Sequence, residues 1–118
     1  EPQDFAGRSD RPVPLVMAPA PCVYRERATS ALDRAHRPWS AVFISPSFAG
    51  VGAAVRAGLG VAVMPQAMVP SGLVTLGPDW PALSPAEMCL LSVARPAPAV
   101  AALAQHITAG VARRRAGL

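Results

Sequence analysis

Apolar and polar residues alternate along the chain in short blocks that indicate strands and helices in turn. Tyr24, Ala28 and Leu32 recur at helical spacing on one face of a segment whose other face is charged. Residues 61–64 are continuously apolar, as in a strand buried on both faces. The pattern predicts strands at 13–18, 39–44, 61–64, 73–76 and 87–94, and helices at 22–36, 47–57 and 98–115. Strands that alternate with helices favour an α/β domain with a mainly parallel sheet and flanking helices.

Three small residues mark the ends of the helix predicted at 47–57. Ser47 precedes its first apolar residue, and a serine at that position can cap free N–H groups. Gly58 permits a positive φ where the helix ends, and Gly60 lets the chain turn into the next strand. Residues 1–12 are polar and predict an irregular leader, which leaves residues 13–118 as one subdomain.

Composition excludes several classes of protein. The 118 residues are 52% hydrophobic and 15% charged, which excludes an intrinsically disordered chain. No uncharged apolar run reaches the roughly 20 residues of a membrane span, so no membrane partner is expected. The net charge is +4, but the arginines are scattered apart from a run at 113–115 that ends a predicted helix. A nucleic-acid-binding surface on this segment is therefore not expected.

No catalytic motif emerges from the sequence. A Gly-x-Ser-x-Gly elbow, a His-x-x-x-His pair and a P-loop are all missing, so we expect neither an enzyme nor a cofactor. His36 stands at a predicted helix end, where the helix dipole accounts for it. Cys22 and Cys89 show no spacing typical of a metal site, and they fit a reduced cytoplasmic compartment.

Residues 55–65, Val-Arg-Ala-Gly-Leu-Gly-Val-Ala-Val-Met-Pro, resemble the core of the effector-binding domain of LysR-type transcriptional regulators. In that family an alanine-rich helix leads through Val-x-Ala-Gly-x-Gly-Val into a strand that ends in proline. Residues 14–25 look like the strand and helix that open the second subdomain. Residues 87–91 and the closing helix look like the return strand and final helix. The resemblance implies an α/β lobe of the periplasmic-binding-protein type II, Rossmann-like fold, with ligand held between two lobes.

The sequence departs from the full family pattern at its start. No winged helix-turn-helix precedes Pro14, and most of the first lobe is missing. We therefore expect residues 13–118 to be the effector-binding second lobe with the returning strand and helix. By resemblance, DNA would be bound only through a winged helix-turn-helix absent from this chain. The resemblance also implies a homo-oligomer and a small-molecule effector that shifts the arrangement of the lobes.

The expected effector site lies beyond the carboxyl ends of the strands, near helix N-termini. Free N–H groups there favour an anion. The resemblance places an effector-contacting loop at residues 45–48, where Ser47 would bond a carboxylate and Phe48 would form an apolar wall. The predicted contacts are Cys22, Ser45, Ser47, Phe48, Pro65 and Gln66.

Each predicted contact also has a plainer interpretation. Ser47 as an N-cap alone, Phe48 as a core residue and Gln66 as a solvated amide would all fit the pattern. Cys22 fits an inert core residue, with redox sensing as the alternative. For the whole chain, the alternatives are a lobe of a periplasmic-type solute-binding protein and an interaction module without a ligand.

Overall fold

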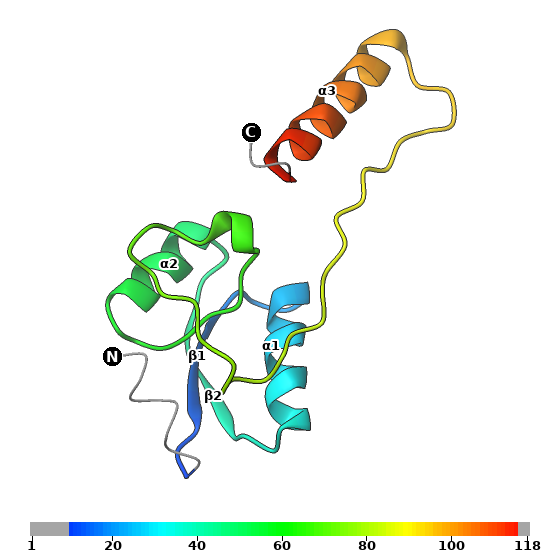
Figure 1. Ribbon diagram of the computed structural model, residues 1–118. Coiled ribbons are helices and arrows are strands. Elements are labelled where there is room, and N and C mark those ends of the chain that lie inside the picture. Colours follow the sequence, from blue (N-terminus) through cyan, green and yellow to red (C-terminus); the bar gives the residue numbers. More distant parts are fainter. Residues whose placement is uncertain (1–9, 116–118) are drawn as a thin grey trace. The chain divides into compact units, whose positions relative to one another are not determined.

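The computed structural model describes residues 10–115 and divides the chain into two compact units, 1–86 and 87–118. The predicted leader lies mostly outside the described residues. The elements, in chain order, are β1 (Val13–Met17), α1 (Val23–Arg34), β2 (Trp39–Ile44), α2 (Phe48–Arg56), the short 3-10 helix η2 (Gln66–Met68) and α3 (Pro98–Arg115) (Figure 1). All of them except α3 belong to the first unit.

Strand β1 is buried on both faces, because the two helices that follow it cover opposite sides. Val13, Leu15 and Met17 point to one face and pack against α1. Val16 points to the other face and packs against α2. Figure 1 shows the strands between the two helices. Period-two alternation therefore divides the core into two layers, and the buried helical residues are Ala28, Ala31, Leu32, Val51, Gly52 and Ala54.

Strand β1 also has neighbours along both edges. It pairs in parallel with β2, from Val13 opposite Trp39 to Met17 opposite Ile44, with a register shift after Leu15. On its other edge it forms an isolated parallel bridge with Val61. There the Val61 N–H donates to the Pro14 carbonyl oxygen at 2.9 Å, and the Val16 N–H donates to the Val61 carbonyl oxygen at 2.8 Å. The predicted parallel α/β arrangement is present in this first unit.

Three predicted strands do not form. Of residues 61–64 only Val61 bridges to β1, while residues 73–76 and 87–94 form no regular structure. Met88 is 82% exposed and Leu91 is 89% exposed. An apolar segment is able to form a strand, but it does so only when a neighbouring segment accepts and donates its backbone hydrogen bonds. The sequence pattern could not show whether such a partner is present.

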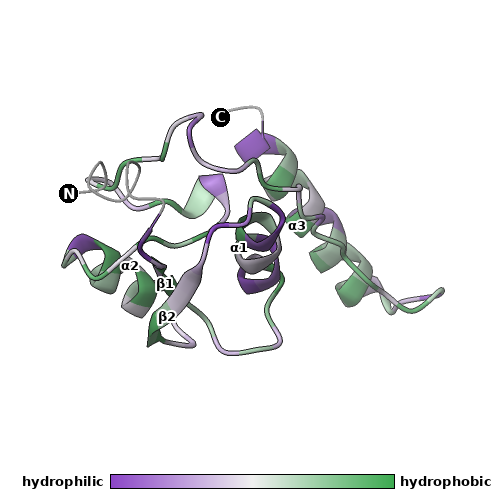
Figure 2. Cartoon of the chain, turned by 90° about the horizontal axis from the view of Figure 1, so that it is seen from below, coloured by the Kyte–Doolittle hydropathy of each residue, from purple (hydrophilic) through white to green (hydrophobic). Residues whose placement is uncertain are grey.

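Helix α3 keeps the predicted bounds. None of its residues is buried, although Val100, Leu103 and Ile107 recur at helical spacing. Figure 2 shows hydrophobic residues along the helix and hydrophilic ones at its C-terminal end, where Arg113–Arg115 lie. Its positive charge is thus at the end that the helix dipole favours.

Helix α2 ends in the hydrogen-bond pattern known as a Schellman motif. The Leu59 N–H donates to the Ala54 carbonyl oxygen at 3.1 Å, and the Gly58 N–H donates to the Val55 carbonyl oxygen at 2.9 Å. Gly58 has a φ of 82°, as the sequence predicted for the residue after this helix. A residue without a Cβ adopts this conformation at no steric cost.

Helix α1 ends in the same motif, with a histidine where α2 has glycine. The Arg37 N–H donates to the Leu32 carbonyl oxygen at 2.9 Å, and the His36 N–H donates to the Asp33 carbonyl oxygen at 3.0 Å. His36 has a φ of 52°, in the left-handed region that costs most residues with a Cβ energy. This position therefore requires a residue that tolerates a positive φ, in addition to any favourable interaction of the histidine with the helix dipole.

His36→Gly is expected to raise the free energy of unfolding by about 1 kcal/mol, because glycine relieves the left-handed strain. The reverse change at the equivalent position, Gly58→Ala, is expected to lower it by about 1 kcal/mol. Urea unfolding followed by circular dichroism measures both. Equal stability of wild type and His36→Gly would show that the histidine side chain compensates for its backbone conformation.

Gly60 has a different role from the predicted one. Positive φ angles among the described glycines occur at Gly58 and Gly72. A Cβ built on Gly60 would collide with the carbonyl group of Pro14, the group that accepts the hydrogen bond of Val61. Glycine is required here because two backbone segments approach closely, and this contact joins residue 61 to β1.

Candidate functional site

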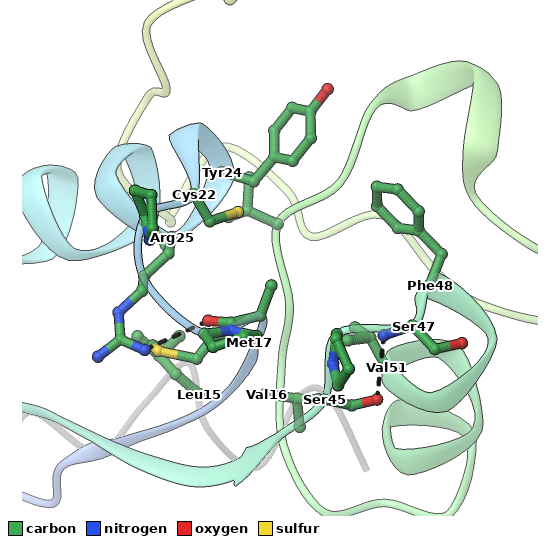
Figure 3. A pocket seen from close by; sticks show the side chains of 16 residues that line it. Leu15, Val16, Met17, Cys22, Tyr24, Arg25, Ser45, Ser47, Phe48 and Val51 are labelled. Atoms are coloured by element: carbon green, nitrogen blue, oxygen red, sulfur yellow. Dashed lines mark hydrogen bonds between the residues drawn. The ribbon is translucent and has the colours of Figure 1, made fainter.

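A pocket of about 320 Å³ lies where β1 and β2 end and where α1 and α2 begin (Figure 3). Its walls come from residues 15–25 on one side and residues 45–51 on the other, with Ala28 and Val63 completing it. Since parallel strands end at a common edge, loops from both βα connections meet there. Open α/β sheets bind their ligands at this edge.

The two serines of the pocket wall are held by backbone N–H groups. Ser47 is the N-cap of α2, and its Oγ accepts a hydrogen bond from the Gly50 N–H at 3.3 Å. The Ser45 Oγ accepts a hydrogen bond from the Ser47 N–H at 3.2 Å. Each hydroxyl still carries one hydrogen that can be donated. A Cβ at Gly50 would collide with the Ser45 side chain, so this glycine leaves room for it.

Two aromatic rings face each other over the pocket and connect the two helices. The centroids of Tyr24 and Phe48 lie 6.2 Å apart, with the ring planes inclined by 58°. This is the tilted arrangement that aromatic pairs favour. Phe48 is 47% exposed, so the alternative that it is a core residue is wrong. Sequence analysis did not single out Tyr24, which it placed on the apolar face of its helix.

One side chain brings a positive charge to the pocket. Arg25 follows Cys22 by one helical turn, and its Nη1 donates to the Ala18 carbonyl oxygen at 3.2 Å. Figure 3 shows Arg25 beside Met17, with Ser45 and Ser47 on the other side. The sequence pattern puts Arg25 on the charged, outward face of the helix, whereas the structure places it in the pocket wall. Its position in the first turn, next to the end of β1, was the available signal.

Cys22 lies in the same wall. It is half-buried with a free thiol, and as the N-cap of α1 it makes no side-chain capping bond. The pocket therefore brings together four of the predicted contact residues, namely Cys22, Ser45, Ser47 and Phe48.

The structure does not bring the two remaining predicted contacts to this pocket. Pro65 is half-buried and Gln66 is exposed, and neither belongs to the wall. Gln66 instead begins η2. Residues 61–64 still pack against both faces of β1, with Val63 in the pocket wall, and the chain then turns at Pro65 into η2.

A larger hollow, of about 1150 Å³, lies between α1, residues 55–64 and residues 69–83. Its walls are mostly aliphatic, and it contains none of the predicted contact residues. Trp80 enters its wall and is packed against the guanidinium of Arg37, whose carbon lies 4.3 Å from the ring centroid. This contact anchors residues 77–81 to the end of α1.

Among residues 10–115, no group of three or more His, Cys, Asp or Glu side chains is placed to hold a metal ion. No helix in that part of the chain is both long and apolar enough to cross a membrane.

Comparison with known proteins shows a family and a relative to which the chain is similar. Residues 4–112 match the family described as the LysR substrate binding domain. The chain is also similar to the HTH-type transcriptional regulator DgdR of Burkholderia cepacia, with 35% identity over 102 residues. That alignment covers 83% of this chain but 34% of the relative, so the chain spans about a third of the length of the protein that it matches.

Proposed function

The chain belongs to the LysR substrate-binding domain family, and from this premise we propose that it senses a small-molecule effector for a DNA-binding transcriptional regulator. The similarity to a regulator described as HTH-type supports the proposal. DNA binding is proposed for a winged helix-turn-helix outside these 118 residues. We therefore favour a regulator over a solute-binding protein or a module without a ligand.

The pocket between the starts of α1 and α2 carries the proposal. It lies at the sheet edge where such folds bind ligands, and four residues that the sequence predicted as contacts line it. The effector would be held by the hydroxyls of Ser45 and Ser47 and by the Phe48 ring. A ligand that binds one arrangement of the lobes more tightly than the other shifts the population toward it. That shift would change the geometry of the attached DNA-binding domains.

The second unit has a distinct proposed role. Met88, Leu91 and Val93 are exposed apolar residues in a segment without strand partners, and α3 has no buried residue. Isolated apolar segments of this kind gain stability when they pair and pack. We propose that residues 87–115 supply a strand and a helix to the first lobe of the effector domain.

The remaining proposals concern the whole protein. The family to which the chain belongs consists of regulators, so we propose no catalytic step and no cofactor for this chain. We propose a homo-oligomer that works in the cytoplasm, where the free thiols of Cys22 and Cys89 would stay reduced.

The test of sensing is a screen of small molecules against the intact protein by thermal shift. A compound that binds the folded state raises its melting temperature by mass action. The compound should also change the affinity of the protein for its operator DNA. A screen in which every stabilising compound leaves DNA binding unchanged would contradict the sensing role.

Phe48→Ala is expected to weaken effector binding about tenfold, because it removes an aromatic wall of the pocket. Phe43→Ala is the matched control, since Phe43 is 38% exposed and does not line the pocket. Calorimetric titration measures both affinities. If both variants lost effector affinity equally, Phe48 would not be a contact residue of the site.

Ser47→Ala is a second test with a known stability cost. It removes the N-cap bond of α2, which costs about 1 kcal/mol of folding free energy. The variant should still fold, and its effector response should fall by more than this stability loss explains. Ser47→Gly separates the two effects, since glycine is tolerated at N-caps but has no hydroxyl.

A further inference from the structure

The pocket is electrostatically one-sided. Arg25 is the cationic residue of its wall, and none of the lining residues is aspartate or glutamate. Within residues 10–115 the polar partner of the guanidinium is the Ala18 carbonyl oxygen, 3.2 Å from Nη1. A guanidinium carries five N–H donors, and one such bond leaves most of them for another acceptor.

The surroundings of Arg25 strengthen the electrostatic interactions of its guanidinium. The side chain is partly buried, and residues such as Leu15, Met17 and Val51 make most of the wall apolar. Charge–charge interactions are weakly screened in such surroundings compared with open water. An anionic group that enters the pocket would therefore be attracted strongly, while a second cation would be repelled.

The opposite part of the wall supplies aromatic contact. The ring centroids of Tyr24 and Phe48 lie 6.2 Å apart. Phe48 is 47% exposed, so part of its ring is accessible to a ligand. The volume of about 320 Å³ accommodates on the order of ten non-hydrogen atoms, at the roughly 30 Å³ that a water molecule occupies in the liquid. These features together select a small ligand with one charged end and one apolar end.

We propose that the effector is a small aromatic or aliphatic monocarboxylate, whose carboxylate is bound by Arg25 and whose body packs on Tyr24 and Phe48. This inference rests on the proposed function and names the chemical class that the site takes. A planar guanidinium matches a carboxylate with two parallel hydrogen bonds. The hydroxyls of Ser45 and Ser47 line the same pocket on the other side from Arg25, where they are donors for the rest of the ligand (Figure 3).

A carboxylate fits this wall better than a phosphate ester does. A phosphate group carries up to two negative charges and three acceptor oxygens, and sites for it usually combine several cations. This pocket has a single guanidinium in its wall. A carboxylate of one charge is matched by one guanidinium.

The experiment compares pairs of probes that differ only in charge. Phenylacetate and phenylacetamide have nearly the same shape, as do hexanoate and hexanamide, and inorganic phosphate serves as the anion without an apolar body. Binding to the intact protein is measured by ligand-observed NMR and calorimetry for wild type, Arg25→Gln, Arg25→Lys and Arg34→Gln. Arg34 lies on the same helix but outside the pocket wall, so its variant removes an equal charge elsewhere.

At least one carboxylate should bind tenfold or more tightly than its amide to wild type, as a charge-assisted hydrogen bond requires. Arg25→Gln should reduce that preference to less than about threefold, whereas Arg34→Gln should keep it. Arg25→Lys should keep part of it, because the charge remains while the paired hydrogen bonds of the guanidinium are lost. The preference should also fall as salt is added.

Three outcomes would overturn the inference. These are equal binding of acids and amides, a preference that survives in Arg25→Gln, and binding of phosphate but of no carboxylate. If amides bind and Phe48→Ala weakens them, the proposed sensing function stands and only the ligand class is wrong. If no organic probe binds and the wider screen finds no effector, the proposed function itself fails.

Discussion

Gly60→Ala is expected to lower the free energy of unfolding by about 3 kcal/mol, at the upper end of what overpacking costs. The new Cβ would collide with the Pro14 carbonyl group, which is backbone and has no alternative rotamer. That carbonyl oxygen accepts the Val61 N–H at 2.9 Å, so the clash and the loss of a hydrogen bond occur together. Chemical unfolding monitored by circular dichroism gives the value directly.

Gly77→Ala is the matched control for this prediction. A Cβ at Gly77 would have no atom within 4 Å, and its φ is not positive. The control should be neutral or slightly stabilising, because alanine reduces the entropy of the unfolded chain. Similar stabilities for the two variants would show that the approach of residue 60 to β1 is not part of the fold.

Leu15→Ala is expected to destabilise the protein by about 3 kcal/mol, within the range for buried leucines. Leu15 is 2% exposed and belongs to the β1 face that packs on α1. Its removal deletes buried methyl groups and leaves a cavity next to Ala28 and Leu32, which belong to the same cluster. The measurement is a urea unfolding curve, with the slope compared between variants to verify two-state behaviour.

Leu83→Ala gives the comparison for the same chemical change at a more accessible position. Leu83 is 47% exposed, so its truncation is expected to cost less than about 1 kcal/mol. If Leu15→Ala cost no more than Leu83→Ala, β1 would not be the centre of the first unit.

The candidate site was largely accessible to sequence reasoning because its parts follow local rules. Ser47 was identified as an N-cap and Gly58 as a helix terminus, since capping depends on residues close in sequence. The position of the site at the ends of parallel strands follows from the order of strands and helices. Arg25 was missed, since periodicity gives the face of a helix but not which residues of another loop lie opposite its first turn.

Other differences between expectation and structure have the same origin. Pro65 and Gln66 were predicted to line the cleft because residues 61–64 were expected to form a strand, but only Val61 bridges to β1 and neither residue lines the pocket. Residues 73–76 and 87–94 have the composition of strands without the hydrogen-bond partners. Gly60 was expected to let the chain turn into the next strand. Its role in the structure is to allow close contact with Pro14, which is far away in the sequence.

The sequence by itself determined the three α-helices, the caps of α2, the parallel β1–α1–β2 unit and, through residues 55–65, the family. These features depend on periodicity, on backbone conformation and on residues near one another in the chain. Only the tertiary structure decided which strands have partners, why Gly60 must lack a side chain, and that Arg25 and Tyr24 share a pocket with Ser47 and Phe48. Those outcomes depend on contacts between distant segments, whose approach is set by packing and hydrogen bonding across the whole unit.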